Sequence, residues 1–337
     1  MSLARAIETG DLAELPSRRD EDWRWTDLRG LIRELPAASS DDAGEIDAGP
    51  FDPISDAVTQ VINGRLRPGV IVDNGVLALR VINRGDGAHA GRHAVFVASG
   101  ESLVLFESYE GRGAHVSEFD LSIAVAAGGR LERIVLVDEP ADAVLVSRAD
   151  VALSSGATFA QTIITSGARR QRIETRVAHP GGGASARLDG LYLLGAQRHA
   201  DITTVVTHEG MDGSTDQLTK GVVRDQGRGV FQGRIVVRPG ADKTDARMGH
   251  HALVLSDRAE VDAKPELEIF ADDVACAHGN TVGALDEDAL FYAEQRGIPE
   301  DAARTMLIEA FVGEVVDRIE HHGAREIVRA WVAERLR

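Results

Sequence analysis

Residues 100–158 read GESLVLFESYEGRGAHVSEFDLSIAVAAGGRLERIVLVDEPADAVLVSRADVALSSGAT. Short runs of Val, Leu and Ile alternate here with turns that a glycine opens, at Gly100, Gly129 and Gly156. Gly183 opens the next such turn, so the successive spacings are 29, 27 and 27 residues. A strand, a helix and a returning strand need ~30 residues or more, so this step is too short for that unit. The repeat therefore predicts a solenoid of strands.

The same step continues less clearly at Gly213 and Gly240. One coil of a solenoid cannot bury its apolar inner face alone, so stacked coils would share a continuous apolar interior. Glycine suits the corners because it adopts positive φ without strain. We expect a mainly β protein built on a right-handed parallel β-helix. Its three parts would be an N-terminal helical region with an acidic linker (residues 1–69), the β-helix core (residues 70–283) and a C-terminal helical domain (residues 284–337).

The C-terminal part shows a helical pattern, because the apolar period changes from 2 to 3.6 after residue 285. Asp286 is a suitable N-cap and Gly297 a suitable stop for the first helix. A second helix would begin at Pro299, and a third near Ala324. We expect these helices to close the open end of the solenoid, where bare strand edges invite aggregation. Their apolar face is wide enough to be a docking surface instead.

The N-terminal region holds two of the three tryptophans. Residues 1–15 have the pattern of a short amphipathic helix, and EDWRWTDL follows at residues 21–28 with Trp23 and Trp25. The simplest interpretation is that the indoles anchor this segment to the core. Residues 37–53 are acidic and of low complexity, so we expect a linker or loop there.

Composition excludes several classes of function. The chain has 337 residues, 37 Lys and Arg against 54 Asp and Glu, and a net charge of −17, which argues against nucleic-acid binding. A single cysteine rules out an intramolecular disulfide framework and suits the reducing cytosol. No apolar run reaches the ~18 residues of a membrane span, and the first residues lack a secretory pattern. We expect a soluble cytoplasmic protein.

The residues best suited to catalysis or metal binding lie in residues 265–291, PELEIFADDVACAHGNTVGALDEDALF. Cys276 and His278 stand at alternate positions, so in a strand they point the same way. A thiol and an imidazole together can be metal ligands, or a nucleophile and its base. A buried cysteine and a hydrogen-bonded histidine with no further role remain the simpler alternative.

Other patterns are weak. Residues 240–244 (GADKT) lack the first glycine of a phosphate-binding loop, so we expect no ATP site in this chain. His89 and His93 lie in glycine-rich sequence and are expected to be solvent-exposed. His250 and His251 would face opposite sides of a strand, so at most one of them could join a site.

The order of residues from 265 to 298 resembles the C-terminal signature of the SufB/SufD family, the iron–sulfur cluster assembly proteins of the SUF system. ADDVACAHG at residues 271–279 is similar to the SufD branch, and LFY and RGI follow at residues 290–292 and 296–298. EDWRWTDL resembles the family's N-terminal motif. Asn280 departs from the signature, where small residues are usual.

The resemblance implies a β-helix fold and a non-catalytic scaffold subunit. It also implies pairing with a SufB-like paralogue through the β-helix, a SufC-like ABC-type ATPase on the C-terminal helices, and a homodimer when the chain is isolated. His278 would lie at the interface with the SufB-like chain, as a ligand or relay for a nascent iron–sulfur cluster. Cys276 is the second candidate. Reduced flavin is associated with such complexes.

The cysteine count limits what this chain can hold. Iron–sulfur clusters normally take four thiolate ligands, sometimes with histidine in place of cysteine, so one Cys and one His require a partner chain. A cluster would then be transient and shared. Two alternatives stay open: a β-helix enzyme acting on polysaccharide, with Asp272 and Asp273 as candidate carboxylates, and a purely structural partner of the ATPase without metal contact.

Overall fold

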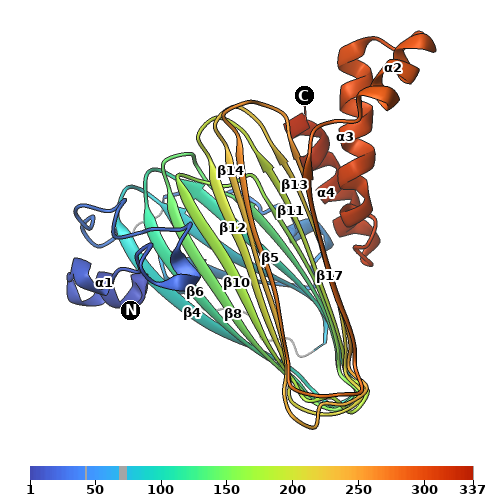
Figure 1. Cartoon of the computed structure of the whole chain (residues 1–337). Helices are drawn as coiled ribbons and strands as arrows, with labels where there is room; N and C mark the ends of the chain where they lie inside the picture. The colour runs from blue at the N-terminus through green and yellow to red at the C-terminus, as the bar shows by residue number, and fades with distance from the viewer. Residues whose placement is uncertain (42–43, 68–73, 337) are drawn as a thin grey trace.

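The computed structural model describes residues 1–41, 44–67 and 74–336. Two sheets enclose one interior, and strands along the chain alternate between them (Figure 1). Among the described residues, the ten-stranded sheet runs in the order β17-β15-β13-β11-β9-β7-β5-β3-β1-β2, and the seven-stranded sheet in the order β16-β14-β12-β10-β8-β6-β4. The parallel β-solenoid predicted from the glycine spacing is confirmed.

The strands are, in chain order, β1 (Ala57–Ile62), β2 (Arg65–Leu66), β3 (Gly75–Arg84), β4 (Ala88–Val97), β5 (Ser102–Arg112), β6 (Val116–Val125), β7 (Arg130–Asp138), β8 (Val144–Leu153), β9 (Thr158–Thr165), β10 (Arg170–His179), β11 (Ser185–Leu194), β12 (His199–His208), β13 (Ser214–Val223), β14 (Arg228–Val237), β15 (Asp245–Val254), β16 (Glu260–Ile269) and β17 (Ala275–Gly283).

Each coil advances by the predicted step. Ser102 pairs with Arg130, and Arg130 with Thr158, so these coils of the ten-stranded sheet are 28 residues apart. From β9 to β17 the step lies between 27 and 31 residues. Gly100 and Gly156 turn the chain between coils with φ of 73° and 67°, where an L side chain would be strained. The spacing of the sequence repeat is therefore the length of one coil.

A continuous apolar cluster runs through the space between the sheets from Ala57 to Ala252. Leu, Ile and Val from both sheets alternate with outward-facing residues and stack from coil to coil, with Phe119, Phe159 and Tyr192 among the larger side chains. This interior is what holds the coils in register.

The N-terminal segment lies against the seven-stranded sheet, with its first helix beside β4 and β6 (Figure 1) and residues 21–26 over β10 to β16. It contains α1 (Leu3–Thr9) and two 3₁₀ turns, η1 (Leu12–Glu14) and η2 (Glu21–Trp23). The single helix expected over residues 1–15 is thus interrupted, because Gly10 takes a left-handed conformation that ends α1.

The described part of residues 37–53 packs on the solenoid and does not form a free linker. Phe51 is buried and stacks on Phe106 with ring centroids 4.8 Å apart, and Asp52, which opens the turn η3 (Asp52–Ile54), pairs with Arg80. β1 already pairs with β3 ahead of the expected core boundary at residue 70. That boundary itself, like residues 42 and 43, lies outside the described residues.

The C-terminal helices are α2 (Glu287–Gln295), α3 (Glu300–Val316) and α4 (His322–Leu336). Asp286 caps α2 as predicted, since its Oδ1 accepts hydrogen bonds from the backbone N–H groups of residues 288 and 289. None of the described helices is both long and apolar enough to cross a membrane.

The expectation that these helices close the end of the solenoid is wrong. α3 and α4 pack on the outer face of the ten-stranded sheet (Figure 1), where Val315, Val328 and Trp331 meet Ile134 and Leu191. That outer face is apolar, so covering it stabilises the fold by removing apolar surface from water. The end of the solenoid is left open as a result.

Candidate functional site at the open end of the solenoid

The last coil of the solenoid ends in two edge strands. β16 is the terminal strand of the seven-stranded sheet, and β17 is the terminal strand of the ten-stranded sheet. Together with the turn at residues 270–274 they form the surface that we call the open end. Ile269, Phe270 and Val282 lie on it with exposed fractions of 41%, 57% and 47%. Edge strands with exposed apolar side chains are typical of surfaces that pair with another chain.

Cys276 and His278 lie on β17 and project from one face of it. They pair in register with Ala246 and Met248 of β15, which are buried in the interior. Cys276 is partly buried in the apolar cluster that includes Met248, whereas His278 is exposed. The two side chains therefore face the solenoid interior at the point where it opens to solvent, as their spacing in the sequence predicts.

The electrostatic surroundings of Cys276 keep it a thiol. Burial raises its pKa, Asp245 raises it further, and the backbone N–H of Ala246 offsets only part of the effect. Since the thiolate is the form that attacks electrophiles and binds metals, Cys276 is not preset as a nucleophile. Among the residues that the structure describes, no group of three or more His, Cys, Asp or Glu could hold a metal ion. Cys276 and His278 alone therefore do not make a complete metal site within the described part of this chain.

The two adjacent histidines of β15 face opposite sides, as predicted. His250 is fully buried, and its Nδ1 lies 2.7 Å from Oδ1 of Asn280, while its Nε2 lies 2.9 Å from the hydroxyl of Tyr192. His251 faces outward, with its Nδ1 2.7 Å from Oγ1 of Thr281. His250 therefore reaches the open end through Asn280. The sequence did not reveal this link.

His89 is not the solvent histidine that we expected. It is buried, with Nδ1 2.8 Å from Oγ of Ser39 and Nε2 2.8 Å from Oδ1 of Asn83, and burial lowers its pKa to about 3. His93 is partly buried, and burial lowers its pKa as well. The sequence could not show the contact of His89 with Ser39, because the two residues are 50 positions apart.

Asp272 and Asp273 lie in the exposed turn between β16 and β17. A polysaccharide-cleaving pair needs two carboxylates that face each other across a bound sugar, from a groove in a sheet. Adjacent residues in an exposed turn do not supply that arrangement.

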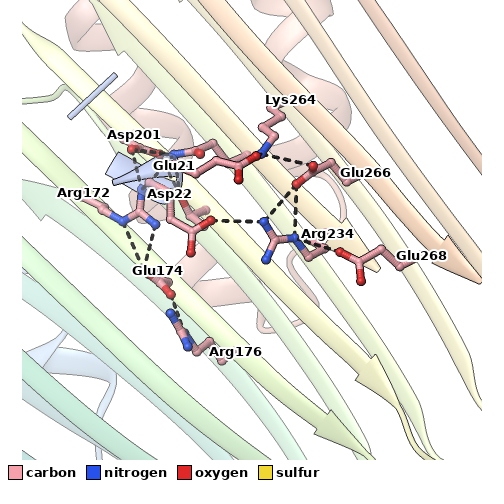
Figure 2. A network of polar contacts seen from close by, with 12 residues as sticks. Glu21, Asp22, Arg172, Glu174, Arg176, Asp201, Arg234, Lys264, Glu266 and Glu268 are labelled. Atoms are coloured by element: carbon pink, nitrogen blue, oxygen red, sulfur yellow. Dashed lines mark hydrogen bonds and ion pairs between the residues drawn. The ribbon is translucent and has the colours of Figure 1, made fainter. Parts of the chain in front are cut away.

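A network of ionic side chains crosses the outer face of the seven-stranded sheet (Figure 2). Arg172 is buried, and its guanidinium group lies 2.9 Å from both Glu174 and Asp201. Burial opposes the ionisation of Glu174, yet Arg172 and Arg176 hold its pKa below the usual range. Arg172 also donates to the backbone oxygen of Asp22 at 2.7 Å. The network fastens the N-terminal segment and has no unpaired charge to offer a substrate.

A groove of about 810 Å³ lies between α3 and α4. Its apolar lining includes Met306, Ala310 and Val332, and its polar lining includes Glu309 and Arg329. Met306 is 45% exposed. An apolar floor with a charged rim is the composition of many protein interfaces.

Comparison with known proteins points to one family. A family model described as "SUF system FeS cluster assembly, SufBD core domain" matches residues 80–311. The iron–sulfur cluster assembly protein SufD of Escherichia coli is 34% identical over 248 residues, which are 73% of this chain and 58% of that protein. A SufBD family protein of Mycobacterium leprae is 28% identical, covering 97% of this chain and 92% of the relative. The chloroplastic protein ABCI7 of Arabidopsis thaliana is 27% identical over 70% of this chain and 50% of its own length.

Proposed function

This chain belongs to the SufBD family of the SUF iron–sulfur cluster assembly system, and we propose that it is a non-catalytic scaffold subunit of the assembly complex. In this role it pairs with a SufB-like chain, carries a SufC-like ATPase and helps to build nascent iron–sulfur clusters, which are the product of the complex. The observation that carries the proposal is the incomplete pair Cys276 and His278 at the open end of the solenoid.

The open end is the surface proposed for the SufB-like partner. Terminal strands of a second solenoid placed against β16 and β17 would pair their backbone groups and bury Ile269, Phe270 and Val282. The partner would also bring its own ligands to Cys276 and His278, which a cluster with four ligands requires. In the absence of the partner, we expect the same surface to pair with a second copy of this chain.

The groove between α3 and α4 is the surface proposed for the ATPase. It joins an apolar floor at Met306 and Val332 to charges at Glu309 and Arg329. The ATPase activity belongs to the partner, because residues 240–244 do not form a phosphate-binding loop.

The two candidate ligands differ in what they need before they bind iron. His278 is exposed, while the raised pKa of Cys276 means that its thiol must lose a proton as the metal binds. A reducing compartment such as the cytoplasm keeps this single thiol free. A reduced flavin in the complex remains a prediction, which the absorbance of flavin released from purified complex would test.

Co-purification tests whether the open end binds the SufB-like chain and the groove between α3 and α4 binds the ATPase. The tagged full-length chain is co-expressed with a SufB-like and a SufC-like protein, and each retained partner is quantified. Ile269→Lys combined with Val282→Lys should release the SufB-like chain but keep the ATPase, and Met306→Lys should do the reverse. Phe96→Lys is the matched control, because Phe96 is 59% exposed on β4, at the other end of the seven-stranded sheet. If the unmodified chain retains neither partner, the proposal is wrong.

Iron retention tests the role of His278 in the same complex. His278→Ala should lower the iron bound about tenfold or more, since even the residues that support metal ligands contribute 10–100-fold to affinity. His322→Ala, an exposed histidine on α4, is the control. Equal iron in both variants with intact complex formation would favour a structural partner of the ATPase that makes no metal contact.

A further inference from the structure

Asn280 lies on the inner face of β17, two residues beyond His278. The register pairs Met248 with His278 and His250 with Asn280, so the side chains of positions 278 and 280 leave the strand on the same side. Alternate residues of a strand are ~6.6 Å apart along the chain. Asn280 is exposed at the open end. Its side chain is therefore a neighbour of anything that His278 binds.

The orientation of the Asn280 amide is set from inside the solenoid. Its Oδ1 lies 2.7 Å from Nδ1 of His250, and Nε2 of His250 lies 2.9 Å from the Tyr192 hydroxyl. The ring of Phe231 is parallel to the imidazole within 1°, with ring centroids 4.8 Å apart. Tyr192 and His250 are fully buried. The imidazole has no freedom to turn.

With Oδ1 of Asn280 turned toward His250, only one set of hydrogen-bond roles fits these three side chains. The oxygen of Asn280 can only accept, so Nδ1 of His250 carries the proton and Nε2 accepts from the Tyr192 hydroxyl. Burial lowers the pKa of His250 to about 4, so the ring is neutral at physiological pH and keeps this tautomer. Because the oxygen of the Asn280 amide accepts from His250 in the interior, the two N–H groups of the amide can donate to a group bound at the open end.

The surroundings of the open end make such a donor useful. The carboxylates of Asp245, Asp272 and Asp273 lie on or next to its strands, in a chain of net charge −17. Anionic sulfur bound there would meet negative charge, and a neutral amide donor offsets this without itself titrating. Hydrogen bonds from N–H groups to cluster sulfurs are among the protein features that tune iron–sulfur clusters.

We propose that the side-chain amide of Asn280 donates a hydrogen bond to the anionic sulfide of an iron–sulfur species held at Cys276 and His278, and that His250 and Tyr192 are the positioning residues that orient it. The inference rests on the proposed function, since it requires iron at His278. It adds a contact to the sulfur that neither the ligands nor the family assignment supplies.

The opposite face of the same two strands provides a matched control. Thr281 is the next residue of β17, and its Oγ1 lies 2.7 Å from Nδ1 of His251, next to His250 on β15. Thr281→Ala therefore removes an equivalent cross-strand bond without touching the inner face. Asn280→Asp is the informative partner of Asn280→Ala, because a carboxylate still accepts from His250 but donates nothing.

The test uses the full-length chain in complex with its SufB-like and SufC-like partners, without oxygen. Ferrous iron is titrated alone and then with inorganic sulfide, and the retained iron and acid-labile sulfide are measured with the sulfur-to-iron absorption bands. Asn280→Ala should bind iron alone as the unmodified chain does but hold sulfide about tenfold more weakly, the usual effect of losing a hydrogen bond to a charged group. Asn280→Asp should lose more sulfide, and Thr281→Ala none.

Tyr192→Phe tests the positioning role. It should weaken sulfide retention a few-fold and shift the absorption bands in the same direction as Asn280→Ala, because His250 loses the donor that sets its tautomer. The proposal is overturned if Asn280→Asp holds sulfide as well as the unmodified chain, which a purely structural bond to His250 would give, or if Thr281→Ala loses as much as Asn280→Ala. His278→Ala is run beside them. If it binds iron normally, the proposed function fails, and this inference fails with it.

Discussion

The carboxylate of Asp189 lies 3.1 Å from Nε of Arg318, where the turn after α3 meets the ten-stranded sheet. The Asp189 side chain is fully buried, and Arg187 lies 3.7 Å from the same oxygen. Burial raises the pKa of Asp189 to about 7 although both arginines lower it. The C-terminal helices are therefore attached to the solenoid through a carboxylate that favours its protonated form.

This attachment predicts that the contribution of Asp189 to stability is lost as the pH rises from about 4 to about 7. The folded-state pKa of Asp189 lies above 3.8, the ordinary value, so within this window the folded chain binds more protons than the unfolded chain. The contribution of Asp189 to the free energy of unfolding then falls with increasing pH and levels off above about 7. Asp189→Asn should reduce the change in the free energy of unfolding between pH 4 and pH 7 by on the order of 1–3 kcal/mol.

Chemical denaturation at pH 5, 6 and 7.5 measures the effect. Glu118 also has its pKa raised to about 7 by burial, so Glu118→Gln should remove a further part of the slope. A slope that is unchanged in Asp189→Asn would show that Arg318 and Arg187 keep the carboxylate ionised throughout.

A buried ion pair inside the solenoid predicts a large loss of stability when one partner is removed. Glu107 and Arg133 are both fully buried, with Oε2 and Nη2 2.7 Å apart, and the Tyr109 hydroxyl donates to the other oxygen of Glu107 at 2.6 Å. Arg133→Met leaves the Glu107 charge uncompensated, which typically costs about 3–5 kcal/mol. The double variant Glu107→Gln, Arg133→Met should recover most of it. Urea denaturation of both variants measures these free energies of unfolding. An Arg133→Met variant as stable as the unmodified chain would contradict the prediction.

The solenoid was predictable because its main determinant repeats along the chain. Gly100 and Gly156 mark coil corners, and the register between coils follows their spacing. The position of the C-terminal helices was not predictable in the same way, because an apolar helix face fits either an open end or a sheet face. The helices pack where apolar side chains point outward from neighbouring strands of the ten-stranded sheet. Which residues lie next to one another on that face follows only from the register of the strands.

The candidate site was predictable to the same extent. The alternation at Cys276 and His278 placed them on one face, whereas the bond between Tyr192 and His250 joins residues 58 positions apart. This separation is about two coil lengths, so the coil length predicts that the two residues lie at corresponding positions of coils two apart. Gly221 is a second signal, because a Cβ there would lie 2.0 Å from the Tyr192 ring. An interior glycine beside a large aromatic residue indicates where that residue points.

The contact between Trp23 and Arg172 predicts unequal roles for the two N-terminal tryptophans. The Trp23 ring lies 4.6 Å from Cζ of buried Arg172 and packs on the apolar cluster that holds α1, whereas Trp25 faces exposed Arg24 at 5.7 Å. Trp23→Ala should destabilise the protein by about 2 kcal/mol, from lost apolar burial and the cation–π contact. Trp25→Ala should cost well under half as much.

Limited trypsin digestion gives an independent measure of the same segment, since Arg18 and Arg19 lie just before Trp23. Cleavage there should be faster in Trp23→Ala than in Trp25→Ala. Equal rates in the two variants would mean that the backbone contacts of the N-terminal segment, and not the indole of Trp23, hold it on the sheet.

The raised pKa of Cys276 predicts slow alkylation of the folded chain. Only the thiolate reacts with iodoacetamide, and burial holds the pKa of Cys276 above 9.0, so labelling at pH 7.5 should be slower than in the urea-unfolded chain. The rate should rise about tenfold per pH unit up to the pKa. Because this is the only cysteine, the mass increase reports on one site.

The same labelling separates the thiol's environment from the proposed interface. Bound SufB-like protein should slow the reaction further at every pH, since it would cover β17 and close the route to Cys276. A folded chain that reacts as fast as the unfolded one would contradict the raised pKa. A complex that reacts as fast as the isolated chain would contradict pairing at the open end, even if the pH dependence is as expected, because alkylation requires access as well as ionisation.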